Sequence, residues 1–385
     1  MNPIRILWIN PSFLDYRIPF YDSLNDLCKG NLYFVYSRSR VPERCVNKIT
    51  NSLGKNAIYL ENEKNISFGN TKSNFSCSSI SIPYPSGLWR ILSSVDADIV
   101  VGEGFFQWTP WALKYSLLRK IPLLIAYERT VHTERNCPAW RTIYRRLLNK
   151  FVSGYLVNGS LCRQYLQEQI RTQDKMIIEG IMAADSECLS SKCEKFRKTI
   201  SREKSEYGIT YIYVGRLIKL KGVEYLLKAW KKHSCHFPQD ILLIIGDGPE
   251  RESLQNFAEE SVIFYGKIDY EYIHEYYAQA DVFIIPTLED NWSLVVPEAM
   301  ACSLPIGCSC YNGCHPELIK NGENGYIFNP MIEESIIKML QYFHGVDLKE
   351  MGVKSKFIEN NFSPIRCAER AYDGIQKIVN KIYIK

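Results

Sequence analysis

The sequence predicts an α/β protein built from two doubly wound domains, each around a parallel sheet. The first indication is length, because 385 residues exceed one ordinary core and fit two domains. The second is a recurring order of apolar strand, polar loop and helix, clearest at 280–300 (ADVFIIPTLEDNWSLVVPEAM). The third is a charged, serine-rich stretch at 185–207 without apolar periodicity, which predicts an interdomain linker.

In the first domain, residues 1–190, short apolar runs predict buried strands. These runs are 5–9, 32–36, 98–101, 121–126, 154–157 and 176–178. Helices are expected after Ser12, at 108–120, at 139–152 and from Ser160 to Ile170. Residues 45–80, rich in Asn, Ser and Lys, predict only weak hairpins or loops.

The second domain, residues 208–362, repeats this pattern. Strands are predicted at 210–214, 241–245, 262–265, 282–285 and 305–309, with helices at 223–231 and from Ser293 onward. A final helix is expected at 364–384. Loops that follow parallel strands lie at the carboxyl edge of the sheet, where ligands bind.

Two carboxylates flank the loop after the strand at 282–285. If the next helix begins near Ser293, the amides from Asn291 to Val295 point back at the loop and suit an anion. Glu298, one turn inside, then reaches a hydroxyl beside that anion, and Asp290 lies on the far side. A sugar nucleotide fits, with phosphate at the amides, ribose at Glu298 and sugar at Asp290. Either acid alone is also explained as a helix-dipole partner.

A second polar loop follows the strand at 210–214, in the segment GRLIKLKG. Gly215 permits a sharp turn, and Arg216 and Lys221 bracket the loop. Two cations at one strand end suit a diphosphate, since arginine forks onto two oxygens and lysine acts as a point charge. A basic pair by itself is also typical of an ordinary surface.

Several of these segments together resemble a known family. DNWSLVVPEAMACSLPI, followed by NGCHPELIKNGENGYIF, resembles the donor-site signature of family-4 retaining glycosyltransferases (glycosyl transferases group 1) of the GT-B fold. The family pattern has Glu, seven residues, then Glu-Ala-Met-Ala, whereas here the first acid is Asp290, and Trp292 and Ser293 replace the common Phe-Gly. GRLIKLKG and Gly246-Asp247-Gly248-Pro249 also resemble family motifs. The similarity is strong from Thr210 to Phe328.

The resemblance implies two Rossmann-like domains facing across a cleft, with helix 364–385 packing back on the first. It implies a donor site in the second domain and an acceptor site in the first. Donor contacts are then expected from Gly215, Gly246, Gly248, Asn291, Trp292, Ser293, Leu294 and Glu298. Catalytic roles are expected for Arg216, Lys221, Asp290 and Glu128.

Acceptor-side candidates come from the ends of first-domain strands. Glu128 follows the strand at 121–126, where similar proteins place a His or an acid facing the donor sugar, and a loop ion pair is the alternative. His132 is the second choice. Arg17 either meets an acceptor phosphate or pairs with Asp15, and Glu103 closes the strand at 98–101.

Charge is divided unevenly along the chain. Residues 1–200 carry 27 Lys and Arg against 17 Asp and Glu, and the remainder is net acidic. A basic first half suggests an anionic partner, such as a phosphate-bearing acceptor or an anionic membrane face, and less so nucleic acid. The helix at 139–152 places Trp140, Tyr144, Leu148 and Phe151 near one face and adds Arg141, Arg145, Arg146 and Lys150. This pattern fits an interfacial helix, or equally a core helix with a solvated basic face.

Compartment and cofactors follow from composition. Thirteen cysteines without a disulfide framework indicate a reducing compartment, and no signal peptide or spanning segment is predicted. We therefore expect a cytoplasmic protein, peripheral to the inner membrane face in the interfacial interpretation. Cys308, Cys310, Cys314 and His315 lack a second paired half, so no metal and no cofactor is expected.

The function implied by the resemblance is transfer of a sugar, with retention, from a nucleotide-diphospho-sugar. The acceptor would be a glycan or lipid-linked glycan in cell-surface polysaccharide synthesis, and no nucleic acid is expected. The alternative is a non-catalytic sugar-nucleotide-binding or scaffolding protein, because Asp290 departs from the family pattern. A dinucleotide-dependent oxidoreductase is disfavoured, since Asn10-Pro11-Ser12 is no glycine-rich loop.

Overall fold

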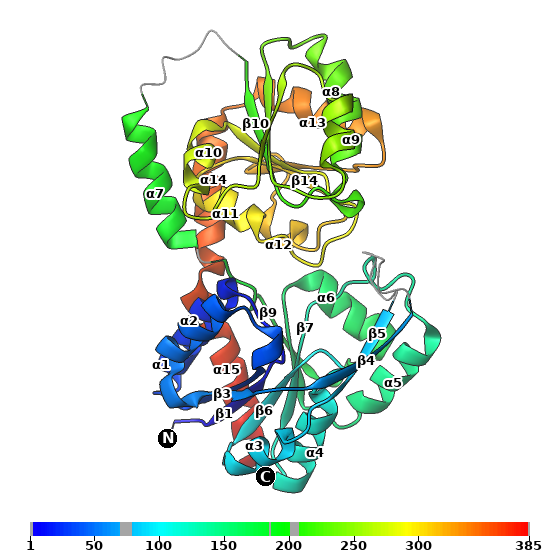
Figure 1. Cartoon of the computed structure of the whole chain (residues 1–385), viewed down its shortest axis with the longest axis vertical. Helices are drawn as coiled ribbons and strands as arrows, with labels where there is room; N and C mark the ends of the chain where they lie inside the picture. The colour runs from blue at the N-terminus through cyan, green and yellow to red at the C-terminus, as the bar shows by residue number, and fades with distance from the viewer. Residues whose placement is uncertain (1–2, 70–78, 185, 201–207, 384–385) are drawn as a thin grey trace. The chain divides into compact units, whose positions relative to one another are not determined.

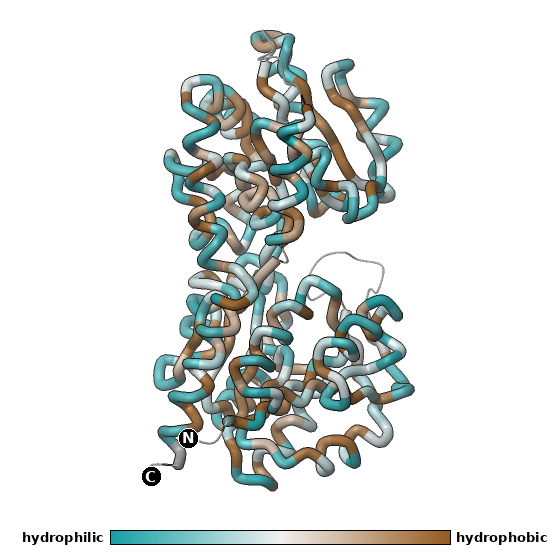
Figure 2. The backbone as a smooth tube through the Cα atoms, turned by 90° about the vertical axis from the view of Figure 1, so that its left-hand side faces the viewer, coloured by the Kyte–Doolittle hydropathy of each residue, from teal (hydrophilic) through white to brown (hydrophobic). Residues whose placement is uncertain are grey.

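The computed structural model describes residues 3–69, 79–184, 186–200 and 208–383. The chain divides into two compact units, each a parallel sheet flanked by helices (Figure 1). Unit 1 is Met1–Ala183 with Pro364–Lys385, and unit 2 is Ala184–Ser363. Hydrophobic stretches run through the strands inside each unit, and hydrophilic residues are frequent on the outer helices and loops (Figure 2).

Unit 1 contains a seven-stranded parallel sheet in the order β3-β2-β1-β6-β7-β8-β9. Its strands are β1 Ile6–Ile9, β2 Leu32–Ser37, β3 Ala57–Leu60, β6 Ile99–Glu103, β7 Leu123–Tyr127, β8 Gly154–Val157 and β9 Met176–Glu179. Its helices are α1 Ile18–Leu27, α2 Glu43–Leu53, α3 Leu88–Ser94, α4 Thr109–Arg119, α5 Ala139–Asn149, α6 Ser160–Tyr165 and α15 Pro364–Tyr383. An antiparallel hairpin, β4 Lys64–Gly69 with β5 Ser79–Tyr84, lies outside the sheet. All four residues of β1 are buried, because a central parallel strand is covered on both faces.

Unit 2 contains a six-stranded parallel sheet in the order β12-β11-β10-β13-β14-β15. Its strands are β10 Thr210–Val214, β11 Ile241–Ile245, β12 Val262–Gly266, β13 Val282–Ile285, β14 Ile306–Ser309 and β15 Gly325–Phe328. Its helices are α7 Ser186–Thr199, α8 Val223–Ser234, α9 Arg251–Phe257, α10 Ile273–Gln279, α11 Val295–Ala301, α12 His315–Leu318, α13 Glu333–Tyr342 and α14 Leu348–Glu359.

Each sheet has a point where the strand order reverses. In unit 1 the first strand, β1, lies between β2 and β6, and in unit 2 β10 lies between β11 and β13. The loops that leave two such neighbouring strands diverge to opposite faces of the sheet, so a crevice opens at their carboxyl ends. The strand order therefore places one crevice at Asn10 and Glu103 in unit 1, and another between the loops after β10 and β13 in unit 2.

Two segments that were expected to form hairpins, loops or a linker each contain a helix. Residues 43–53 form α2, which buries Cys45, Val46, Ile49 and Leu53, although 45–80 was predicted as hairpins or loops. The stretch predicted as linker contains α7, which buries Leu189 and Cys193 against α10 and α11. In both segments only a few apolar residues at helical spacing meet the core, and frequent polar residues conceal them in the sequence.

The last helix, α15, packs against α1 and β9 within unit 1. Every cysteine in the described part of the chain is free of a disulfide. We also find, within the same residues, no helix with the length and hydropathy that crossing a bilayer requires.

Candidate functional site

Glycines hold the loops after β10 and β11 of unit 2 together. A Cβ on Gly246 would lie 1.8 Å from the Gly215 carbonyl oxygen, and one on Gly248 would lie 2.3 Å from that of Leu217. A Cβ on Gly222, which has φ +66°, would lie 2.1 Å from the Pro286 carbonyl oxygen, so the loops after β10 and β13 also touch. The backbones can approach this closely only without side chains. These glycines shape the candidate donor crevice, and Gly222 was not singled out in the sequence.

The centre of this crevice is an ion pair between Lys221 and Asp290, residues 69 positions apart. The Asp290 carboxylate also accepts a hydrogen bond from Ser293 Oγ at 2.6 Å and from the Trp292 amide at 3.1 Å. Its side chain is 17% exposed, so the pair is partly shielded from water. The structure thus brings together two predicted site residues that were assigned to different parts of the donor.

Arg216 differs from Lys221 in that its guanidinium has no ion-pair partner within the described part of the chain. It lies exposed directly after Gly215, and among the described residues its guanidinium makes no ion pair. The Arg216 carbonyl oxygen accepts a hydrogen bond from the buried Tyr213 hydroxyl at 3.0 Å, which anchors the backbone of the loop. The backbone of Arg216 is therefore anchored, while its guanidinium is exposed and accessible to a ligand.

The amides that were expected to face an anion are partly occupied. Helix α11 begins at Val295 rather than near Ser293. The Trp292 amide donates to Asp290, and the Ser293 amide donates to Asn312 Oδ1 at 3.2 Å. Asn312 was missed because its side chain belongs to a loop 19 residues farther along the chain. Two of the five amides that were predicted to face a phosphate, those of Trp292 and Ser293, are therefore engaged within the loop itself.

The remaining donor-side residues divide into buried and accessible ones. Trp292 is buried, and the centroid of its ring lies 5.8 Å from that of Phe362. Trp292 is therefore a packing residue. Glu298 is half-buried in α11 and accepts a hydrogen bond from the Tyr277 hydroxyl at 3.4 Å. Asn291 and Leu294 are also half-buried in the loop. Of these, Glu298 has the charge and position to contact a hydroxyl.

Unit 1 has a cavity of about 290 Å³ at the carboxyl ends of β1, β6 and β7. Arg17, Glu103 and Glu128 line it, whereas His132 is not among the lining residues. Beside these charged groups, the walls contain one amide and several aromatic rings: Asn10, Phe13, Tyr16, Phe105, Phe106 and Tyr127. Polar and charged groups that converge on one cavity beside aromatic rings are candidates for contacts with a small molecule.

Glu103 presents one free oxygen to this cavity. Its Oε1 accepts hydrogen bonds from Trp8 Nε1 at 2.9 Å, from Arg17 Nη2 and Asn10 Nδ2 at 3.3 Å, and from the Tyr21 hydroxyl. Among the described residues, none bonds to Oε2. Arg17 is buried against this carboxylate, and Asp15 pairs with Arg44 instead. The expected surface pair of Arg17 with Asp15 is therefore absent, and Arg17 orients Glu103.

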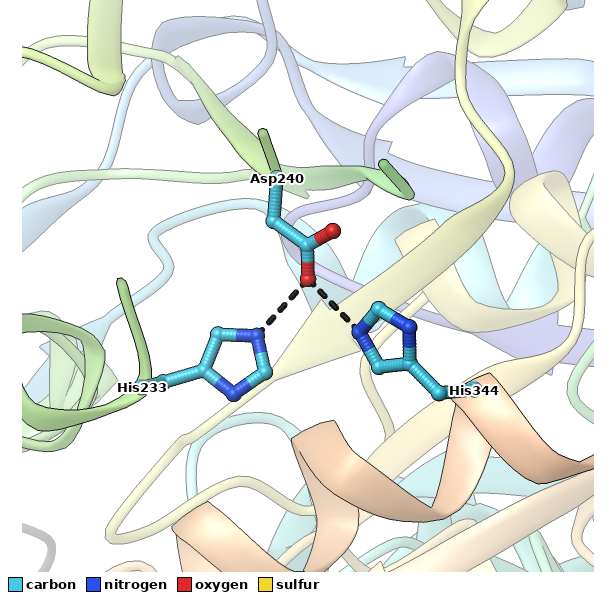
Figure 3. Close-up of side chains that lie close together, drawn as sticks. All are labelled: His233, Asp240 and His344. Carbon is cyan, nitrogen blue, oxygen red and sulfur yellow. Dashed lines mark hydrogen bonds and ion pairs between the residues drawn. The ribbon is translucent and has the colours of Figure 1, made fainter. Parts of the chain in front are cut away.

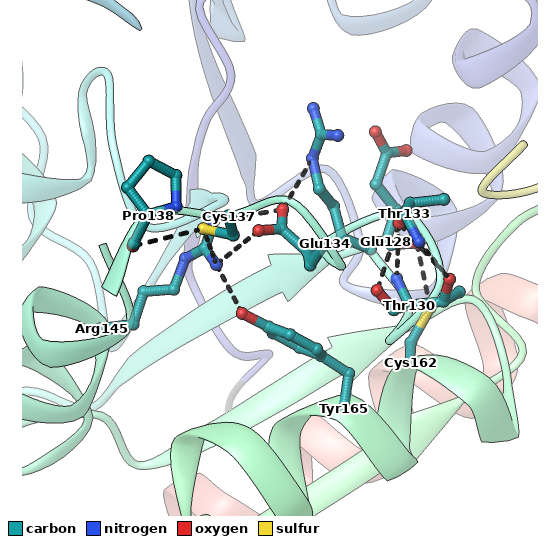
Figure 4. A network of polar contacts seen from close by, with 10 residues as sticks. Glu128, Thr130, Thr133, Glu134, Cys137, Pro138, Arg145, Cys162 and Tyr165 are labelled. Carbon is teal, nitrogen blue, oxygen red and sulfur yellow. Dashed lines mark hydrogen bonds and ion pairs between the residues drawn. The ribbon is translucent and has the colours of Figure 1, made fainter. Parts of the chain in front are cut away.

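A buried ion pair, which sequence reasoning missed, supports the same cavity. Arg145 donates to Glu134 through Nη1 at 2.7 Å and through Nη2 at 3.2 Å, and also bonds the Tyr165 hydroxyl (Figure 4). Burial would raise the pKa of Glu134, but the hydrogen bonds from Arg145 outweigh it, and this pKa is lowered. The sequence carries no local pattern that indicates this pair, because Glu134 and Arg145 are 11 residues apart and belong to different elements.

Helix α5 differs from the predicted interfacial helix. Arg141 and Arg145 are buried, as is Leu148, whereas Arg146 and Lys150 remain at the surface. The exposed face of α5 and the turn after it instead carry apolar side chains, each about half exposed: Trp140, Ile143, Leu147 and Phe151. We call these four residues the α5 stripe. The helix therefore exposes apolar side chains and two cations to solvent, rather than the four cations that were predicted.

The fold and both crevices define a protein of the GT-B class, with two Rossmann-like units, as the sequence predicts. Residues 194–347 match the model of the family Glycosyl transferases group 1, which confirms the predicted resemblance for that part of the chain. Membership of family 4 stays a prediction.

Individual proteins are similar to this chain at about 30% identity. Over 255 residues it is 30% identical to the sulfoquinovosyl transferase SQD2 of Arabidopsis thaliana, covering 62% of this chain and 48% of that protein. Over 134 residues it is 30% identical to the alpha-monoglucosyldiacylglycerol synthase of Acholeplasma laidlawii, covering 34% of this chain and 33% of that protein. The chain thus spans less than half the length of either relative. Among solved structures, Anabaena HepE in complex with UDP has a TM-score of 0.70 at 15% identity, covering 97% of this chain and 100% of that one, which shows the shared fold.

Proposed function

We propose that this chain is a retaining glycosyltransferase that uses a nucleotide-diphospho-sugar. Unit 2 would hold the donor, and the cavity of unit 1 would hold a glycan or lipid-linked glycan acceptor. The carrying observation is the Lys221–Asp290 pair beside the unpartnered Arg216, at the strand-order reversal of unit 2. The names of the matched family and relatives support the reaction class.

The two cations supply what departure of a diphosphate requires. In the proposed step, an acceptor hydroxyl oxygen bonds to the anomeric carbon as the bond to the diphosphate oxygen breaks on the same face. The hydroxyl proton passes to the leaving phosphate oxygen, so no enzyme carboxylate need become a nucleophile. Arg216 and Lys221 stabilise the negative charge that develops on the diphosphate. Asp290 holds Lys221 near that position while the donor is absent.

On the acceptor side, Glu103 suits a hydroxyl better than an anion. Its free Oε2 can accept a hydrogen bond from a sugar hydroxyl, and the four donors on Oε1 fix the orientation of the carboxyl group. Aromatic walls such as Phe105 and Phe106 offer apolar area to a sugar ring. Glu128, exposed at the cavity rim, stays a candidate for facing the donor sugar.

Arg216→Ala tests the donor assignment. Loss of one charge-assisted contact of roughly 1.5–3 kcal/mol should lower donor binding or turnover by about ten- to hundred-fold. The measurement is thermal shift with UDP-, GDP- and ADP-sugars, followed by kinetics with the sugar nucleotide that binds. Lys219→Ala is the matched control, because Lys219 is an exposed cation in the same loop. Equal kinetics for the two variants would refute the diphosphate role.

Lys221→Ala is a less clean test. It removes the same kind of contact but leaves the Asp290 carboxylate without its cation, so stability and binding change together.

The second candidate function is a non-catalytic sugar-nucleotide-binding protein. It is favoured by Asp290, which stands where the family pattern has glutamate and is engaged by Lys221 and Ser293. The two functions differ in one readout. A transferase releases free sugar and nucleoside diphosphate slowly from its donor without acceptor, whereas a binding protein shows a donor-dependent thermal shift and no hydrolysis.

The α5 stripe supports docking of unit 1 on an anionic bilayer, where a lipid-linked acceptor would be found. Each side chain that enters the interface contributes up to about 1.5–3 kcal/mol, and Arg146 and Lys150 add on the order of 1 kcal/mol each. Ile143→Ser with Leu147→Ser should therefore lower the partition onto anionic vesicles at least about tenfold, measured by co-sedimentation at low salt.

The matched control for this prediction is Val353→Ser with Phe357→Ser. These residues form an apolar pair on α14 of unit 2 that has the same spacing and is more exposed than Ile143 and Leu147. The control should leave vesicle binding unchanged, and neither double variant should alter the donor-dependent thermal shift. If the wild-type chain remains in the supernatant at low salt, the stripe does not bind membranes.

A further inference from the structure

Two histidines from separate elements of unit 2 converge on one carboxylate oxygen of Asp240. His233 lies in the last turn of α8, Asp240 directly precedes β11, and His344 follows α13. Nε2 of His233 lies 2.7 Å from Asp240 Oδ2, and Nε2 of His344 lies 2.8 Å from the same oxygen (Figure 3). These three atoms all lie within 4.8 Å of one another.

The surroundings hold the three groups in this orientation. The ring of Phe237 stacks on His233 at 4.8 Å and on His344 at 3.9 Å between centroids, with interplanar angles of 18° and 21°. The second oxygen of Asp240, Oδ1, accepts a hydrogen bond from the Ile209 amide at 2.8 Å. Both ring planes and the carboxylate are therefore fixed by contacts outside the cluster, so little ordering is left for a ligand to impose.

Burial differs among the three groups in a way that suits a bound ion. His233 and Asp240 are buried, and the His344 side chain is 24% exposed, which leaves one open side. His233 Nδ1 is buried and, among the described residues, has no hydrogen-bond partner. A buried nitrogen without a hydrogen bond costs stability. Since Nε2 of His233 faces Asp240, we expect this imidazole to contact a ligand through Nε2.

We propose that His233, Asp240 and His344 form a binding site for a divalent transition metal such as Zn²⁺. The ligands are Nε2 of each histidine and Oδ2 of Asp240, with a water in the fourth position on the side of His344. Two imidazoles and a carboxylate match the nitrogen and oxygen ligands that zinc takes at about 2.0–2.2 Å. When Nε2 binds the metal, each ring carries its proton on Nδ1 instead, so both imidazoles stay neutral, and the three ligand atoms move apart from hydrogen-bonding distance.

The position of the site indicates a structural role. Asp240 precedes β11, so the cluster lies at the amino edge of the sheet, whereas the donor loops follow the carboxyl ends of the strands. A metal there ties the end of α8 and the start of β11 to the turn after α13, which lies 104 residues beyond Asp240. The Cys308, Cys310, Cys314 and His315 group does not compete, because among the described residues only the His-Asp-His cluster has ligand atoms close enough.

The test uses the full untagged chain, stripped with EDTA and titrated with Zn²⁺. We expect one equivalent to bind and to raise the Tm of unit 2 by about 5–10 °C at a hundred times Kd. Co²⁺ in place of Zn²⁺ should give the visible absorption of a four-coordinate site. His344→Gln keeps a polar group beside Asp240 but should weaken metal binding at least about hundredfold.

His236→Gln is the matched control, since His236 is exposed three residues from His233 and lies outside the cluster. It should bind Zn²⁺ as the wild type does. The proposal is overturned if the stripped wild-type chain shows no stoichiometric binding, or if His344→Gln binds equally well. Donor-dependent thermal shift should be the same in both variants, so this test and that of the proposed function fail independently.

Discussion

Arg145→Met should lower the free energy of unfolding of unit 1 by about 3–5 kcal/mol. The substitution leaves the Glu134 carboxylate, which is 1% exposed, without the guanidinium that binds both of its oxygens. An uncompensated buried charge is among the costliest defects in a protein interior. Arg129, 3.4 Å from Glu134 and partly exposed, compensates only in part. Hydrogen exchange of peptides from β7 and β8 measures the loss within this unit.

Two further variants show whether the charge is the cause. Arg146→Met, on the next residue of the same helix, should cost at most about 1 kcal/mol, because Arg146 lies nearer the surface and pairs with a carbonyl. Glu134→Leu combined with Arg145→Met should be less destabilising than Arg145→Met alone, since no charge is left behind. A double variant that is less stable than the single one would contradict this account.

Glu359 should make the stability of unit 2 fall as pH rises. Burial between α14 and α7 raises the pKa of this carboxyl to about 7, while its hydrogen bond with Ser186 opposes the rise. The unfolded chain has the ordinary value near 4.5. Between these two values the folded state holds more protons than the unfolded state, so stability is fully present below about pH 4.5 and declines up to about pH 7. The whole decline is about 3 kcal/mol.

Glu359→Gln should remove this slope and make unit 2 more stable than the wild type at pH 8. Urea unfolding between pH 5 and pH 8.5, followed by hydrogen exchange of α14 peptides, checks the prediction. Glu350→Gln, on the exposed face of the same helix, should retain the wild-type slope. Parallel slopes for wild type and Glu359→Gln would show that this carboxyl ionises normally in the folded chain.

The Lys221–Asp290 pair changes how the donor site is understood. As separate motif residues they suggest one contact to the diphosphate and one to the sugar. As a pair they form a neutral element that the proposed diphosphate would have to reopen, because Lys221 cannot fully serve Asp290 and a phosphate together. Arg216 needs no such exchange, so it is expected to make the first contact with the donor.

The sequence by itself determined the two-domain α/β fold, most strands of both sheets and the glycine-rich turns of unit 2. Each of these is a local signal: a continuous apolar run such as 241–245 is a strand buried on both faces, and Gly-x-Gly at 246–248 is a turn that excludes side chains. Helices α2 and α7 were missed because their few buried residues are dispersed among polar ones.

Only the tertiary structure decided which charges meet. Four basic residues in α5 look alike in the sequence, yet Arg145 is buried on Glu134 while Lys150 is solvated. Likewise His233, Asp240 and His344 are unremarkable along the chain and share one oxygen in the fold. The physical reason is that an ionisable side chain takes its role from the partner and the water around it, and both are set by residues distant in sequence.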